Sequence, residues 1–116
     1  MAVVKVLIKG YSDDKPDKIK AIGTVSLVIS GENKIIVDTG NPSSKNEILD
    51  KLRKQNIKPG SINFVINTHL DMDHTGCNSI FEYADLIGYG QILKGDIFYF
   101  FSLWFAGQFW GLWHLQ

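Results

Sequence analysis

Residues 67–76 of this 116-residue chain read Asn-Thr-His-Leu-Asp-Met-Asp-His-Thr-Gly, and the rest of the sequence is interpreted around them. Four potential metal ligands fall within six residues: His69, Asp71, Asp73 and His74. Imidazole nitrogens together with carboxylate oxygens suit zinc, iron or manganese, whereas calcium and magnesium prefer oxygen ligands alone. The alternative is a polar loop in which Asp73 or Thr75 caps a short helix. Four ligand-type residues at this density favour the first interpretation, a metal-binding loop.

A second motif lies upstream, where the apolar run Ile35-Ile36-Val37 ends in Asp38-Thr39-Gly40. The carboxylate of Asp38 has two interpretations. It could accept a hydrogen bond from a metal-bound histidine and so orient the ring, or it could form a turn with its own backbone. The residues alone leave both open.

The chain before this motif predicts strands. Residues 2–9 alternate loosely between apolar side chains and lysine, which predicts a first strand. The polar segment 11–20, which contains Pro16, is expected to be an exposed loop. Residues 22–30 and 34–37 are expected to pair as a hairpin around Gly31-Glu32-Asn33.

A helix is expected between the two motifs. It opens at residues 41–44, with Ser44 and Glu47 at the spacing of a capping box, and it ends at Lys58-Pro59-Gly60. Residues 62–66 form the next strand, so a strand–helix–strand crossover makes these two strands parallel. Both Asp38 and the metal loop then fall at the carboxyl ends of the strands, where α/β proteins bind their ligands.

Further along, residues 77–81 predict a short helix, and residues 84–88 and 96–101 predict two short strands. Cys77 is interpreted as an inert buried thiol rather than as a metal ligand. As the only cysteine, it excludes an internal disulfide and suits a reducing compartment. The N-terminal residues lack the long apolar core of a signal peptide, which favours a cytoplasmic protein.

The two motifs together resemble the signature of the metallo-β-lactamase superfamily: His-x-His-x-Asp-His followed by a small residue and glycine, with a strand ending in Asp-Thr-Gly upstream. Residues 6–11 and 24–28 resemble one particular branch of that superfamily. This resemblance implies an α/β (α+β) fold, the N-terminal half of an αββα sandwich, with a mixed sheet and one crossover helix. The chain departs from the signature at Asp71, which stands where the pattern has its second histidine and makes the site more anionic.

The resemblance also implies a metal-dependent, zinc-type hydrolase with one or two metals, iron and manganese being alternatives. His69 and Asp71 would hold one ion and Asp73 and His74 a second, with Asp38 behind them. Asp73 would also take up a proton during the reaction. The substrate would be a small molecule or a phosphodiester. The alternative is a non-catalytic metal-binding half-domain, because superfamily domains run to about twice this length and draw further ligands from their second half.

The C-terminal segment differs from the rest. After Asp96 no Lys, Arg, Asp or Glu occurs, and all three tryptophans lie there. Residues 1–96 are therefore expected to form the truncated superfamily domain and residues 97–116 an aromatic, apolar tail. A product of gene truncation or frame alteration is favoured over a membrane anchor, and a homo-oligomer joined through this tail is a third interpretation. The net charge of zero gives no sign of a nucleic-acid partner.

Overall fold

A seven-stranded sheet runs through residues 2–100, the part of the chain that the computed structural model describes. Its strands, in spatial order, are β1 (Ala2–Ile8), β4 (Val25–Ser30), β5 (Asn33–Val37), β6 (Phe64–Ile66), β7 (Asp85–Gly88), β8 (Gln91–Lys94) and β9 (Ile97–Phe100). The three central strands, β5, β6 and β7, are parallel, and the strands on either side of them pair antiparallel. The predicted mixed sheet is confirmed.

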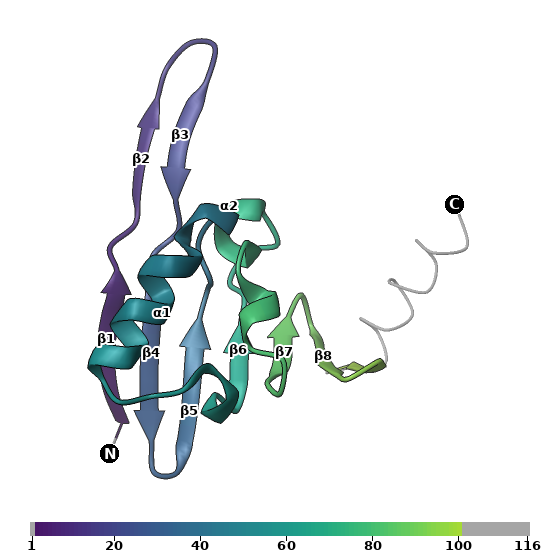
Figure 1. Ribbon diagram of the computed structural model, residues 1–116. Helices are drawn as coiled ribbons and strands as arrows, with labels where there is room; N and C mark the ends of the chain where they lie inside the picture. The colour runs from purple at the N-terminus through teal and green to yellow at the C-terminus, as the bar shows by residue number, and fades with distance from the viewer. Residues whose placement is uncertain (1, 101–116) are drawn as a thin grey trace.

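The predicted crossover is confirmed as well. After β5 the chain passes through a 3-10 turn, η1 (Pro42–Ser44), into α1 (Lys45–Lys54), and it returns through η2 (Pro59–Ser61) to β6. Ile48 and Leu52 of α1 are fully buried, and α1 lies across one face of the sheet, over β1 and β4 (Figure 1). This connection brings the carboxyl ends of β5 and β6 side by side.

Both ends of α1 differ from the prediction. Ser44 precedes the helix but makes no side-chain cap; its hydroxyl instead accepts a hydrogen bond from the Asn41 N–H at 3.2 Å. The helix ends at Lys54, before the predicted stop at residues 58–60. The physical reason is Asn56, which takes a left-handed φ of +57°, because asparagine tolerates this helix-ending conformation better than most residues.

The structure corrects the prediction that residues 11–20 form a loop. It is a two-stranded arm, β2 (Tyr11–Asp14) and β3 (Ile19–Ile22), paired antiparallel around a turn that contains Pro16. The arm extends beyond the end of the sheet (Figure 1). All of β2 and half of β3 are exposed. Three of the four β2 residues are polar, so β2 lacks the alternating apolar residues that identify a strand in a sequence.

The core lies between the sheet and α1. Val25, Leu27, Ile36 and Val65 are fully buried beneath the helix. The strand residues that alternate with them point to the other face, where they are only half-buried or exposed. The sheet is therefore covered on one side by the described helices and has a second, largely apolar side that no described element covers.

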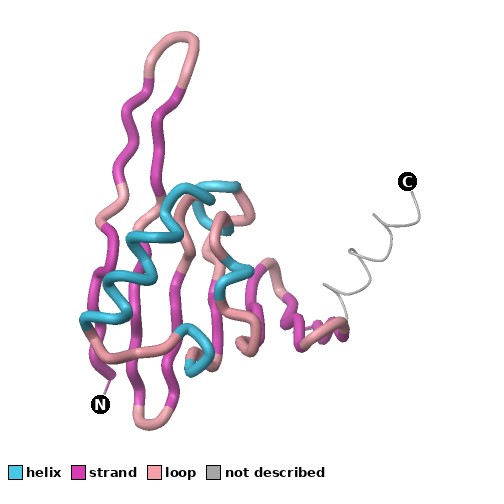
Figure 2. Tube along the Cα trace, viewed as in Figure 1, coloured by secondary structure: helices cyan, strands magenta, loops and turns pink. Residues whose placement is uncertain are grey.

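The C-terminal part of the sheet is a hairpin of β8 and β9, of which β8 was not predicted. Figure 2 shows these strands at the far edge of the sheet, before the grey trace begins. The proposed division between residues 96 and 97 falls within this hairpin, four residues before β9 ends at Phe100. The predicted tail spans residues 97–116: its first four residues form β9, and residues 101–116, on which the tail interpretations mainly rest, lie outside the described residues. Within residues 2–100, no helix has the length and apolar character needed to cross a bilayer.

Candidate metal centre

The candidate site is built where β5 and β6 end. Asp38 follows β5 directly, and the loop that contains His69 follows β6 and leads into α2 (Met72–Thr75), a single helical turn. The Asp38 N–H donates to the Ile66 carbonyl at 2.7 Å, and the Thr39 N–H donates to the His74 carbonyl at 2.8 Å. These backbone hydrogen bonds bring the two sequence motifs together.

Asp38 holds the ring of His74. The distance from His74 Nδ1 to Asp38 Oδ2 is 2.9 Å, which fits Nδ1–H donating to the carboxylate. Asp38 is 5% exposed, and its other hydrogen bonds come from the Thr68 N–H, at 2.8 Å, and the Thr68 hydroxyl. Its φ of +60° lies in the left-handed region, which aspartate tolerates better than most non-glycine residues. The Asp38 carboxylate therefore bonds to residues of the segment after β6, and not to the backbone of its own turn.

Asp73 stands on the other side of the same ring. His74 Nε2 lies 3.5 Å from Asp73 Oδ2. When Nδ1 carries the proton donated to Asp38, Nε2 has a free lone pair next to a carboxylate oxygen. One nitrogen and one oxygen donor at this spacing can coordinate the same ion, so His74 and Asp73 form the best-arranged pair of the four predicted ligands.

His69 lies nearby, and Asp71 does not join the group. The ring centroids of His69 and His74 are 4.7 Å apart with the planes tilted by 41°, and His69 Nδ1 is 3.1 Å from the Thr68 hydroxyl. Asp71 is exposed at the start of α2, where its backbone carbonyl accepts from the His74 and Thr75 N–H groups. Within residues 2–100 its carboxylate makes no hydrogen bond or ion pair.

The donor types of the four predicted ligands suit a transition metal, but only some of their side chains lie close enough together to share one. Two imidazoles and two carboxylates make a borderline donor set that suits zinc, with iron or manganese as alternatives. Among the described residues, however, no three His, Cys, Asp or Glu side chains are arranged to hold a metal ion. The fold therefore supplies an oriented His74–Asp73 pair with His69 beside it, and Asp71 would have to turn inward to take part.

Several residues that support the site were not identified from the sequence. The Asn67 side-chain amide donates to the His74 carbonyl at 3.1 Å and exchanges hydrogen bonds with Asn78, which also accepts from the Thr39 hydroxyl. The signal for Asn67 in the sequence is a polar residue directly after an apolar strand, and the structure shows this residue to be buried. Together these amides and hydroxyls fix the backbone of His74 relative to the ends of β5 and β6.

Gly23 is a second residue that sequence reasoning missed. Its N–H donates to the Asp73 carbonyl at 3.1 Å, so the end of the β2–β3 arm lies directly against the metal loop. A Cβ at this position would come within 2.6 Å of the Asp73 carbonyl oxygen and 2.9 Å of His74 Nδ1. Only glycine allows this close approach.

Cys77 is buried, as predicted, with 2% of its surface exposed. Its thiol donates to the Asn41 carbonyl at 3.0 Å. Desolvation by burial raises the pKa of this thiol, although Lys45 acts in the opposite direction. A protonated thiol bonded to the backbone is a poor metal ligand, which agrees with leaving Cys77 out of the site.

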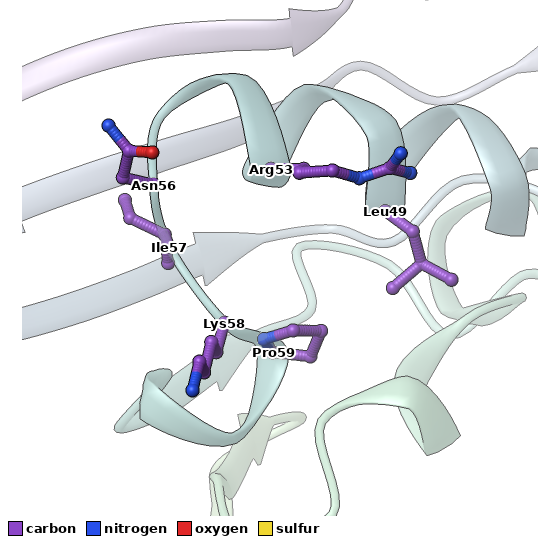
Figure 3. A pocket seen from close by; sticks show the side chains of 6 residues that line it. All are labelled: Leu49, Arg53, Asn56, Ile57, Lys58 and Pro59. Carbon is purple, nitrogen blue, oxygen red and sulfur yellow. The ribbon is translucent and has the colours of Figure 1, made fainter.

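One pocket on the helical side lies away from the candidate centre. A pocket of about 410 Å³ sits at the C-terminal end of α1, between that helix and η2 (Figure 3). Its lining combines apolar Leu49, Ile57 and Pro59 with Arg53, Asn56 and Lys58. It shares no residue with the metal loop, so it is separate from the candidate centre.

Comparison with known proteins gives consistent matches. The family described as the metallo-beta-lactamase superfamily matches residues 20–85. Metallo-beta-lactamase domain-containing protein 1 of Xenopus laevis is 38% identical over 85 residues, covering 72% of this chain and 36% of the relative. The protein of the same name from Rattus norvegicus is 29% identical over 112 residues and is covered to 45% of its length. The chain thus spans less than half the length of these curated relatives. Their shared name identifies the branch of the superfamily that this chain resembles, which confirms the branch resemblance predicted from residues 6–11 and 24–28.

Solved structures agree on the fold. A Thermotoga maritima structure assigned to the metallo-beta-lactamases superposes with a TM-score of 0.65 at 30% identity, covering 73% of this chain and 42% of that one. BJP-1, a subclass B3 metallo-beta-lactamase of Bradyrhizobium japonicum, gives 0.50 at 30% identity, with coverages of 54% and 25%. Members of this group generally bind metal ions, which agrees with the donor chemistry of the loop. The sheet, the crossover helix, the two motifs and these matches together show that the chain belongs to the metallo-beta-lactamase superfamily.

Proposed function

We propose that the chain carries the metal-binding part of a metal-dependent hydrolase site. The observation that carries this proposal is the orientation of His74. Its Nδ1 is hydrogen-bonded to Asp38 at 2.9 Å, and its Nε2 lies 3.5 Å from the Asp73 carboxylate. An imidazole whose second nitrogen is bonded to a buried carboxylate is the usual arrangement of a metal-binding histidine.

His69, Asp73 and His74 are the proposed protein ligands, with Asp71 completing the set when its side chain turns inward. Zinc is the proposed ion, and iron and manganese are the competing ions. When bound, such a metal lowers the pKa of a coordinated water and polarises the bond to be hydrolysed. Asp38 keeps the His74 ring in place and in the required tautomer, while Asp73 is the proposed proton acceptor.

A second candidate function is metal binding without catalysis. It is favoured by the absence, within residues 2–100, of three converging ligand side chains. A catalytic zinc needs three protein ligands and an open position, and a second ion would need still more. Hydrolysis also requires groups that position the substrate, and loss of positioning alone can lower rates by several orders of magnitude.

Turnover by the metal-loaded chain separates the two candidates. The zinc- and manganese-loaded proteins are assayed against phosphodiester, thioester, lactone and β-lactam substrates. Because the site is incompletely assembled, we expect metal binding with little or no turnover. Turnover that disappears in a His69→Ala variant would establish the hydrolase within this chain. An Asp17→Ala variant, which alters the exposed arm, is the control that should match the unmodified chain.

A further inference from the structure

A groove runs along α1, on the side of the sheet that this helix covers. Its first part is the pocket at the C-terminal end of α1, where Leu49 of the helix faces Pro59 of η2 (Figure 3). A second pocket, of about 460 Å³, adjoins it: the two share Leu49 and Pro59, and the second extends to Lys45 at the start of the helix. We name the two pockets together the α1 groove.

One wall of the α1 groove is a single row of the helix. Lys45, Leu49 and Arg53 line it and follow one another at intervals of four residues, so they lie on one helical face. The rise of the helix separates neighbours in this row by about 6 Å, and the backbone positions of the two cations by about 12 Å. The wall therefore presents an apolar contact midway between two positively charged residues.

The other wall adds a third cation and more apolar surface. It is formed by Lys58 and Pro59, and by Ile80 of η3 (Asn78–Ile80). In the described lining of the two pockets, the acidic residue is Glu82, against three basic residues. Positive charge thus exceeds negative charge here, although the chain as a whole has no net charge. Charge complementarity favours an acidic ligand.

The three cations are available to such a ligand. Within residues 2–100, Lys45 and Lys58 make no ion pair. Arg53 lies 3.8 Å from Asp50, but the two side chains are 75% and 48% exposed, and an ion pair in contact with water contributes little. An acidic ligand can therefore engage all three cations without breaking a buried ion pair.

We propose that the α1 groove binds an extended, acidic peptide segment of another protein. In a strand, alternate side chains lie on the same side about 6.7 Å apart, close to the steps of the helical row. Acidic, apolar and acidic residues at alternate positions therefore set two carboxylates opposite Lys45 and Arg53, with the apolar side chain against Leu49. Lys58 lines the same end of the groove as Arg53 and adds to the charge there.

The arrangement favours a peptide over a small anion or a nucleic acid. A single carboxylate or phosphate would engage only one end of the groove, because the cations stand at both ends of the helical row. A nucleic-acid strand carries a negative charge at every nucleotide, which would include the positions opposite Leu49 and Glu82. The inference is independent of the proposed metal chemistry, since the described lining of the groove contains no residue of the metal loop.

The test is the fluorescence anisotropy of labelled peptides titrated with the full chain at low ionic strength. A peptide with Glu-Thr-Leu-Thr-Glu at its centre should bind. An isomeric peptide with the two glutamates adjacent should bind about fivefold more weakly, the contribution of one exposed ion pair, because one carboxylate then lies away from its cation. The two peptides have the same composition and charge, so the comparison removes non-specific attraction.

Variants of the chain locate the binding to the groove. Arg53→Glu should weaken binding of the first peptide by about tenfold or more, because repulsion replaces attraction, and Lys58→Glu should act in the same direction. Lys51→Glu is the matched control: it makes the same change of charge on the same helix but lines neither pocket. It should bind as the unmodified chain does. Circular dichroism checks that each variant keeps its helix and sheet.

Three results would overturn the proposal. The first is an unmodified chain that does not bind the first peptide. The second is equal affinity for the two peptides, or equal losses in Arg53→Glu and Lys51→Glu, because binding would then reflect overall charge. The third is a single-stranded oligonucleotide that displaces the labelled peptide at a lower concentration than the unlabelled peptide does, which would assign the groove to nucleic acid.

Discussion

His74 Nδ1 lies 2.9 Å from Asp38 Oδ2, across thirty-six residues of sequence. The hydrogen bond joins the end of β5 to the loop after β6, and it fixes which nitrogen of the ring is left for a metal. Asp38 is buried and receives two further hydrogen bonds from Thr68. The orientation of the ligand is thus a property of the sheet edge, present before any ion binds.

Replacing Asp38 by asparagine should weaken metal binding. The amide keeps the size and tolerates the left-handed φ, but only its oxygen can accept hydrogen bonds, so His74 loses its charged partner. We expect zinc affinity to fall by about 10- to 100-fold, the usual cost of losing such a partner. Titration calorimetry measures this. Asp17→Asn on the exposed arm is the control, and an affinity equal to that of the unmodified chain would show that Asp38 does not orient the ligand.

Gly23→Ala should disturb the same ring from the other side. The new Cβ would lie 2.6 Å from the Asp73 carbonyl oxygen and 2.9 Å from His74 Nδ1, so the loop must move. We expect a loss of about 1–3 kcal/mol in the free energy of unfolding, together with weaker zinc binding. Gly60→Ala is the matched control, because its Cβ would meet only Tyr83 at ordinary contact distance, 3.5 Å. Equal denaturation midpoints for the two variants would contradict the close approach.

Asp71→His should change metal preference. A histidine at this position restores the superfamily pattern and replaces a hard oxygen donor with a softer nitrogen donor. We expect zinc affinity to rise relative to manganese affinity. Competition titrations with the two ions measure the ratio. A ratio equal to that of the unmodified chain would mean that the side chain at position 71 does not turn inward to bind the metal.

Cys77 should react slowly with thiol reagents. Burial raises the pKa of its thiol, so at a pH where a free cysteine is partly thiolate, the folded protein still holds this thiol protonated. The pH profile of alkylation should therefore be displaced to higher pH relative to a free cysteine. Unfolding in guanidinium should remove the displacement. Rapid alkylation of the folded chain near neutral pH would contradict the buried, protonated thiol.

Much of the sheet could be predicted because its central strands are apolar on both faces. β5 and β6 carry continuous apolar runs, and the short helix between them dictates parallel pairing. The β2–β3 arm could not be predicted in this way. Its strands are four residues each and mostly exposed, and β2 has three polar residues, so backbone pairing rather than an apolar pattern identifies them as strands.

In the candidate site, too, the sequence identifies the ligand-type residues but not the distant contacts that position them. The ligand-type residues His69, Asp71, Asp73 and His74 are adjacent in sequence and were identifiable by residue type and spacing. Which of them converge depends on contacts from elsewhere: Asp38 beneath His74, Gly23 against Asp73, and Asn67 on the His74 backbone. These partners follow three different strands, and no local pattern specifies their distances.

The central claim is that the loop after β6 binds a transition metal, and metal binding by the purified chain tests it most directly. Calorimetric titration with zinc, together with metal content after dialysis, should show at least one bound ion for the unmodified chain. The His69→Ala/His74→Ala double variant should bind none, while His114→Ala, which removes the histidine outside the loop, should bind as the unmodified chain does. A double variant that binds zinc with unchanged affinity and stoichiometry would contradict the account, because the loop would then not be the metal site.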